Sequence, residues 1–213
     1  IGKRENVEKV VTLAKQQNIP IRIGVNAGSL EKDLLDKDIP LHEKMVESAM
    51  KHIQILEDLE FDKIKVSLKS SDVLTTIEAY RLMAQRVEYP LHLGVTEAGT
   101  LKGGLIKSSV GLGTLLAEGI GDTIRVSLTE NPVEEVFAGY EILKSLKLRQ
   151  RGVNFVSCPT CGRTQIDLIG LAKKVEARFK NLDKNITIAT MGCSVNGPWE
   201  SRHADFGIAG GIN

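Results

Sequence analysis

The stretch Ile21-Arg22-Ile23-Gly24-Val25-Asn26 carries the pattern on which the predicted fold rests. Its apolar residues alternate with polar or small ones, and successive side chains of a β-strand point to opposite faces. The same alternation returns in residues 63–69, 91–96 and 123–129. We therefore expect four strands, each with one apolar face and one polar face.

Segments with helical periodicity separate these strands, at residues 40–59, 72–87, 101–118 and 132–146. Asp72 suits an N-cap position, and Asn131 followed by Pro132 is a typical helix start. Strands that alternate with helices at this spacing predict βα units and a parallel sheet. An open sheet covered on both faces should be apolar on both, so the polar faces favour a closed barrel.

Four βα units make about half of a (β/α)₈ TIM barrel. We expect residues 1–149 to be the C-terminal half of such a barrel, its last four βα units. Half a barrel has two unpaired edges. The other half is expected to precede Ile1 rather than to come from a second chain.

The pattern changes near residue 150. Residues 151–158 and 185–191 are predicted strands, and residues 165–182 are a predicted helix between them. We expect residues 150–213 to form a small α+β domain, which a bound metal centre would help to stabilise because its own core is small.

The composition excludes several classes of protein. Lys and Arg total 28 and Asp and Glu total 27, a net charge of +1, which gives no sign of attraction to nucleic acid or to a membrane. No apolar run approaches the roughly 20 residues of a membrane span, and the first residues lack the apolar core of a signal peptide. We expect a cytoplasmic location.

Three cysteines, an odd number, favour metal or redox chemistry over structural disulfides. Cys158 and Cys161 form a C-x-x-C motif after one predicted strand, and Cys193 follows the next strand. A thioredoxin-like dithiol would leave Cys193 unexplained. The spacing leaves open a structural zinc site, with His203 as a further ligand, and an iron–sulfur cluster, with Glu200 as the ligand of the remaining iron.

Cations gather on the predicted polar face. Arg22, Lys69 and Arg125 lie on three different strands, and Lys65 lies nearer the start of its strand. Like charges in a cavity of low dielectric repel, so they need an anion, and phosphate fits Arg and Lys well. Inward salt bridges are the alternative, although the same faces offer few acids. Further hydrogen bonds would come from Asn26, Ser127 and Thr129.

Glu97 follows the third predicted strand, and barrel enzymes carry their chemistry at the carboxyl ends of strands. It is a candidate general acid or base, with helix capping as the alternative. His92 also faces inward on this strand. Because single inward histidines are more often satisfied core residues, His92 is assigned no role.

Six motifs together go beyond any of these local signals. In chain order they are IRIGVNAGS (21–29), KVSLK (65–69), HLGVTEAG (92–99), GIGDTIRVSL (119–128), CPTC (158–161) and GCSVNGP (192–198). The set resembles the 4-hydroxy-3-methylbut-2-enyl diphosphate synthase family of the methylerythritol phosphate pathway of isoprenoid biosynthesis. The resemblance covers essentially the whole chain.

The resemblance implies a (β/α)₈ barrel followed by a [4Fe–4S] domain like those of sulfite reductases. In the family, three cysteines and one glutamate bind the cluster, and they match Cys158, Cys161, Cys193 and Glu200. The implied reaction opens the ring of 2-C-methyl-D-erythritol 2,4-cyclodiphosphate and removes a hydroxyl as water, with two electrons from flavodoxin or ferredoxin. The implied assembly is a head-to-tail homodimer.

The family's diphosphate contacts match Arg22, Asn26, Lys69 and Arg125, and its acidic residue near the reacting carbons matches Glu97. We include Ser127 among the expected substrate-binding residues. Two departures stand out. The family reads Gly-Pro-Gly-Glu where this chain has Trp199 before Glu200, and a bulky residue there could change the turn.

The second departure is that the first four βα units are expected before Ile1, so we expect this fragment alone to be inactive. The competing hypothesis is a zinc-stabilised phosphate-binding module without redox activity.

Overall fold

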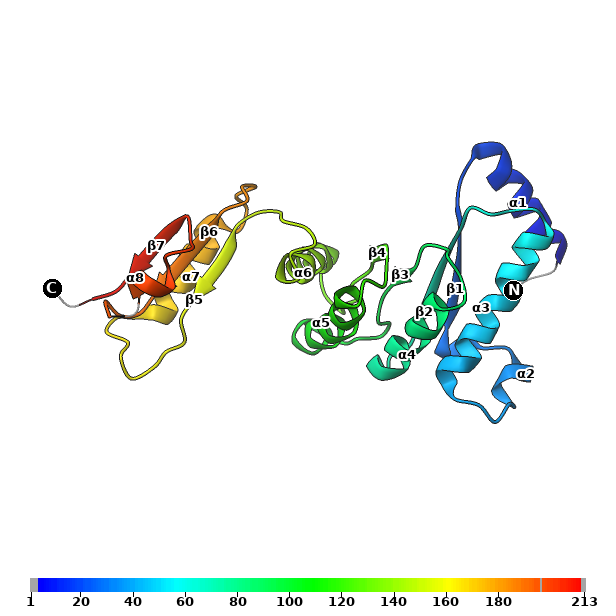
Figure 1. The fold of residues 1–213 in the computed structure, drawn as a ribbon, viewed down its shortest axis with the longest axis horizontal. Coiled ribbons are helices and arrows are strands. Elements are labelled where there is room, and N and C mark those ends of the chain that lie inside the picture. Colours follow the sequence, from blue (N-terminus) through cyan, green and yellow to red (C-terminus); the bar gives the residue numbers. More distant parts are fainter. Residues whose placement is uncertain (1–3, 196, 212–213) are drawn as a thin grey trace. The chain divides into compact units, whose positions relative to one another are not determined.

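A computed structural model of the protein describes residues 4–195 and 197–211. The chain divides into two compact units, Ile1–Leu146 and Lys147–Asn213 (Figure 1). None of the described helices is long and apolar enough to cross a membrane.

The first unit alternates helices with strands. In chain order its elements are α1 (Arg4–Gln17), β1 (Ile21–Asn26), the 3₁₀ turn η1 (Ala27–Ser29), α2 (Lys32–Leu35), α3 (Leu41–Asp58), β2 (Ile64–Lys69), α4 (Val73–Ala84), β3 (His92–Leu93), α5 (Leu101–Ala117), β4 (Thr123–Ile124) and α6 (Pro132–Ser145). The helices α4 and α6 begin after the N-caps Asp72 and Asn131, as expected.

The strands of this unit are parallel. β1 pairs with β2, so that Arg22 lies opposite Lys65 and Asn26 lies opposite Lys69. β3 pairs with β4 in the same sense. A parallel bridge between Val66 and Leu91 ties β2 to the start of β3. The predicted βα units with parallel pairing are thus confirmed.

The alternation along each strand separates a core face from a polar face. Ile23 and Val25 of β1 and Val66 and Leu68 of β2 are buried, whereas Arg22 is exposed. The helices α3 and α4 pack against these strands (Figure 1). Burial of each large aliphatic side chain contributes roughly 2 kcal/mol, and this holds the strands in the register that aligns the polar face.

β3 and β4 are shorter than predicted, and a tyrosine from α4 accounts for part of the difference. The hydroxyl of Tyr80 accepts a hydrogen bond from the Leu68 N–H (3.0 Å) and donates one to the His92 carbonyl (2.5 Å). One step earlier, the Val66 N–H bonds directly to the Pro90 carbonyl at 2.9 Å. Leu68 and His92 would be the next pair of a regular parallel ladder. The Tyr80 oxygen therefore replaces one ladder bond and keeps the strand ends apart.

The second unit is small and contains one three-stranded sheet and two helices among its described residues. Its elements are β5 (Asn154–Ser157), α7 (Leu168–Phe179), β6 (Thr187–Met191), α8 (Gly197–Glu200) and β7 (Phe206–Ala209). The three strands are parallel in the order β5-β6-β7. Its core centres on Val153, Val175 and Ile188 and is small, as expected.

Candidate functional site

The four cations of the predicted polar face lie on neighbouring strands. Arg22 and Lys65 are paired across β1 and β2, and the Arg125 N–H, just after β4, bonds to the Leu93 carbonyl at 2.9 Å. A Cβ placed on Gly94 would lie 3.4 Å from Cδ of Lys69 and 3.8 Å from Cβ of Arg125. Lys69 and Arg125 therefore flank Gly94 on the same face, and a larger side chain there would intrude between them.

The electrostatics of this face reflect unpaired positive charge. Burial lowers the pKa of Lys69, and the charges of Arg125 and Arg22 lower this pKa further. Within the described part of the chain, no carboxylate forms an ion pair with Arg22, Lys65, Lys69 or Arg125. The inward salt bridges considered from the sequence are thus not formed there.

Polar groups accompany the cations at the strand ends. Asn26 lies opposite Lys69 where β1 and β2 end. The guanidinium of Arg125 donates a hydrogen bond from Nη2 to Oγ of Ser127 at 3.1 Å, which fixes the direction of the guanidinium. Such a set of hydrogen-bond donors and fixed charges is suited to binding phosphate oxygens.

Glu97 lies in the turn after β3 and is exposed. Its φ of 52° is in the left-handed region, which costs a non-glycine residue on the order of 1 kcal/mol. The turn is held by bonds from the Thr96 N–H to the Ser70 carbonyl (3.1 Å) and from the Thr129 N–H to the Gly99 carbonyl (2.9 Å). The N-cap of α5 is Thr100, so Glu97 does not cap that helix.

His92 differs from the satisfied core histidine that the sequence suggested. Its Nδ1 lies 2.8 Å from Oγ1 of Thr123, but its Nε2 is buried and has no hydrogen-bond partner among the described residues. Burial, followed by the charges of Arg22, Lys69, Lys65 and Arg125, lowers its pKa to about 4. The sequence contained one sign of this role. His92 lies on a predicted strand whose neighbours carry Lys65, Lys69 and Arg125 on the same face, and this was not taken into account.

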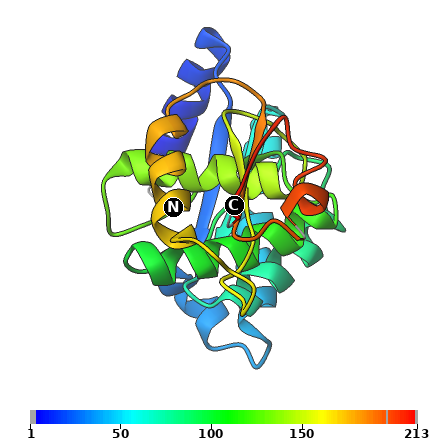
Figure 2. The same ribbon diagram turned by 90° about the vertical axis from the view of Figure 1, so that its left-hand side faces the viewer.

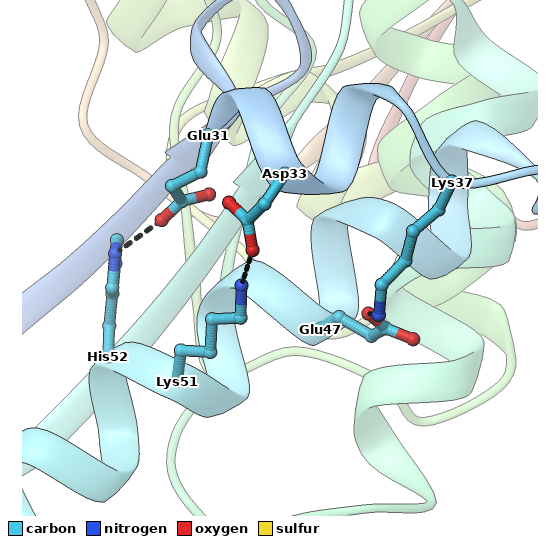
Figure 3. Close-up of polar contacts among 6 residues, drawn as sticks. All are labelled: Glu31, Asp33, Lys37, Glu47, Lys51 and His52. Carbon is cyan, nitrogen blue, oxygen red and sulfur yellow. Dashed lines mark hydrogen bonds and ion pairs between the residues drawn. The ribbon is translucent and has the colours of Figure 1, made fainter.

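The segment that follows Asn26 is anchored to α3 by three pairs of side chains (Figure 3). Nε2 of His52 lies 2.9 Å from Oε1 of Glu31, and Nζ of Lys51 lies 2.6 Å from Oδ2 of Asp33. The third pair is Lys37 and Glu47. Because η1 and α2 lie in this segment, the pairs limit how far the chain beyond Asn26 can move.

Two cysteine loops meet at the ends of β5 and β6 in the second unit. The Gly192 N–H donates a hydrogen bond to Sγ of Cys158 at 3.1 Å, and the Gln165 N–H bonds to the Gly192 carbonyl at 2.9 Å. Cys193, next in the chain, is 7% exposed. The backbone N–H of Arg163 lowers the pKa of the exposed Cys161 thiol. Thiols from separate loops with N–H donors to sulfur are a donor set that fits an iron–sulfur cluster.

The expected ligands are not gathered into a metal-binding group. Within residues 4–195 and 197–211, no three His, Cys, Asp or Glu side chains lie close enough together to hold a metal ion. Glu200 is exposed on α8. The Arg202 guanidinium stacks 3.9 Å from the centre of the Trp199 ring, and its Nε donates to Nε2 of His203 at 2.8 Å. Ligation by Glu200, or of zinc by His203, remains a prediction.

A separate groove of about 460 Å³ lies between α5 and α6, which run side by side in Figures 1 and 2. Leu105, Phe137 and Ile142 line it, together with the acids Glu134 and Glu141. No Lys or Arg lines the groove, so it does not match a diphosphate. The cation-bearing face, with Lys69 and Arg125 on either side of Gly94, is therefore the better candidate site.

The fold and the site define a class of protein: an α/β protein with a cation-lined parallel βα domain and a small cysteine-bearing domain after it. Residues 1–140 match the family described as the GcpE TIM-barrel domain, and residues 154–213 match the GcpE protein C-terminal domain. The chain belongs to the GcpE family.

Curated relatives agree with this assignment. The chain is 64% identical over 212 residues to 4-hydroxy-3-methylbut-2-en-1-yl diphosphate synthase (flavodoxin) of Geobacter sulfurreducens, which covers 99% of this chain and 60% of that protein. The proteins of the same name from Clostridium perfringens and Fusobacterium nucleatum are 62% and 60% identical, again over 99% of this chain. The chain spans about 60% of the length of these relatives. The resemblance seen in the six motifs is thus confirmed.

Proposed function

We propose that this chain is the C-terminal part of an enzyme that reduces 2-C-methyl-D-erythritol 2,4-cyclodiphosphate to 4-hydroxy-3-methylbut-2-enyl diphosphate. The observation that carries the proposal is the set of four cations that form no ion pair with a described acidic residue, on the polar face of a GcpE TIM-barrel domain. The names of the relatives support the same reaction. In this proposal residues 1–149 are the last four βα units of the barrel, and residues 150–213 are a cluster domain of sulfite-reductase type.

Lys69, Arg22 and Arg125 hold the diphosphate in this mechanism, with Lys65 as a further cation. Burial, and after it the charges of Arg125 and Arg22, lower the pKa of Lys69 in the free protein, and an anion that binds here offsets the repulsion among these cations. Asn26 and Ser127 supply hydrogen bonds at the ends of their strands. Because the strands fix the positions of these groups before substrate arrives, little reorganisation is needed on binding.

Glu97 supplies a proton to the departing hydroxyl. Backbone hydrogen bonds tie its turn to Ser70, just after β2, and to Thr129, after β4, so the backbone fixes the point from which the carboxylate projects. The strained φ of 52° supports a role that depends on direction, because a relaxed turn would point the side chain elsewhere.

Cys158, Cys161, Cys193 and Glu200 would hold a [4Fe–4S] cluster, which supplies electrons one at a time when bound. The Gly192 N–H stabilises negative charge on the Cys158 sulfur. Flavodoxin, the donor in the relatives' name, or ferredoxin provides the two electrons. A head-to-tail homodimer would bring the cysteine domain of one chain to the barrel of its partner.

The test uses the complete protein, purified without oxygen, with reduced flavodoxin as the donor. We expect turnover of the cyclic diphosphate, iron in stoichiometric amount, and loss of both with Cys193→Ser. Ser194→Ala, at the exposed neighbouring position, is the matched control and should retain both. Full turnover by Cys193→Ser would contradict the mechanism, and a colourless protein with stoichiometric zinc would favour a phosphate-binding module instead.

A further inference from the structure

His92 is held at its backbone and at its ring. Its carbonyl accepts a hydrogen bond from the Tyr80 hydroxyl at 2.5 Å, and its ring Nδ1 lies 2.8 Å from Oγ1 of Thr123. Thr123 is also its partner in the pairing of β3 with β4. These two contacts hold the imidazole on the polar face.

The other ring nitrogen is left without a partner. Nε2 of His92 is buried, and no described residue forms a hydrogen bond with it. Buried polar atoms are nearly always paired, because loss of water without a replacement costs free energy. Nε2 of His92 lies on a face that otherwise carries cations. Its missing partner is therefore best explained as an atom of a ligand that binds to this face.

The charged groups around the ring restrict what that partner is. Arg22 on β1, Lys65 and Lys69 on β2, and Arg125 after β4 all act on His92. None of these four donates a hydrogen bond to Nε2 in the described structure. Burial and these charges lower the pKa of His92 to about 4, so the ring is neutral near pH 7 and adds no fifth positive charge.

We propose that His92 is a substrate-binding residue whose Nε2–H donates a hydrogen bond to an oxygen of the phosphate group held by Lys69 and Arg125. The Thr123 hydroxyl can donate or accept, and in this arrangement it donates to Nδ1, so that the hydrogen of the neutral ring lies on Nε2. Phosphate oxygens only accept hydrogen bonds, which is why this tautomer is required. The inference rests on the proposed diphosphate site and extends it by one residue.

The test measures binding of inorganic pyrophosphate to the complete protein by calorimetry. His92→Phe keeps the ring size but removes both nitrogens, and we expect it to weaken binding by about 10- to 100-fold, the value of one hydrogen bond to a charged acceptor. His92→Gln retains an N–H donor and should remain within about 5-fold of the unaltered protein. Lys69→Met tests the phosphate site itself and should lose binding.

The outcomes distinguish the role of His92 from the existence of the diphosphate site. Loss of binding by Lys69→Met with unchanged binding by His92→Phe would overturn the role of His92 and leave the diphosphate site intact. No pyrophosphate binding by the unaltered protein would overturn both.

A measurement on the unaltered protein covers the case in which His92→Phe does not fold. Nitrogen-15 NMR of the imidazole should find hydrogen on Nε2 and none on Nδ1 from pH 6 to pH 8, with a shift of the Nε2 signal when pyrophosphate is added. Hydrogen on Nδ1 in the pyrophosphate complex would contradict the proposal.

Discussion

Replacing Tyr80 by Phe removes a single oxygen atom from between β2 and β3. The side chain is 0% exposed, so no water can take the place of that oxygen without a rearrangement. The Leu68 N–H and the His92 carbonyl then both lose their partner, at a cost of about 1–3 kcal/mol for each unsatisfied group. Partial closure of the strands would recover some of this, so we expect the free energy of unfolding to fall by about 2–4 kcal/mol.

The matched control is Tyr89→Phe. The hydroxyl of Tyr89 donates to Oε1 of Glu57 at 2.8 Å, but the residue is only half-buried, so its loss should cost less than about 1 kcal/mol. Urea denaturation of both variants gives the comparison, with an unchanged m-value as the sign that only stability has changed. A loss for Tyr80→Phe no greater than that for Tyr89→Phe would refute the role assigned to the Tyr80 hydroxyl.

The same hydroxyl predicts a pH dependence. Burial raises the pKa of Tyr80 to about 12 from its ordinary value of 10.0. The unfolded chain therefore loses this proton at lower pH than the folded chain does, and the stability that depends on it is present below pH 10 and is lost between about pH 10 and pH 12. The loss is up to about 3 kcal/mol. Unfolding measured across this range should show the difference between the unaltered protein and Tyr80→Phe becoming smaller as pH rises.

Three further variants test other parts of the first unit. Lys69→Met should stabilise the ligand-free protein by roughly 1 kcal/mol in urea denaturation, because it removes repulsion among like charges, and the gain should shrink in high salt. The pKa of His92 is lowered to about 4 in the folded protein. As pH falls, the imidazole is therefore protonated in the unfolded chain before it is protonated in the folded one. Stability should therefore drop by about 1 kcal/mol from pH 6.5 to pH 4, less than the full shift implies because solvent screens a ring that is only half-buried, and His92→Gln should remove that drop. Gly121→Ala should lower the melting temperature far more than Gly119→Ala: both have positive φ, but a Cβ on Gly121 would lie 2.4 Å from Cδ1 of Leu93, whereas one on Gly119 meets nothing within 4 Å.

The sequence predicted the features that depend on local pattern. The period of two along β1 and β2 placed Ile23 and Val66 in the core and Arg22 and Lys69 on the other face, because burial of one face leaves no alternative register. The N-cap at Asp72 was equally local, since its side chain accepts from an N–H three residues later in the same helix.

What the sequence did not reveal depends on contacts between distant residues. Tyr80 was predicted only as part of a helix, and its place between two strands depends on how α4 packs against them. The unpaired nitrogen of His92 follows from the same packing. β7 was missed because all its residues are exposed and it is defined by pairing with β6. The contact of Gly192 with the Cys158 sulfur joins two loops that no spacing rule connects.

The neutral state of Tyr80 and His92 bears on which ligand this face selects. Both lie close to the positive charge of Arg22, and both stay uncharged near pH 7. Neither compensates the cations, so the charge of Arg22, Lys65, Lys69 and Arg125 remains for a ligand to neutralise. A monophosphate can offset only part of this charge, whereas a diphosphate places two anionic groups within reach of cations on several strands. The net charge of this face is therefore consistent with the proposed diphosphate ligand.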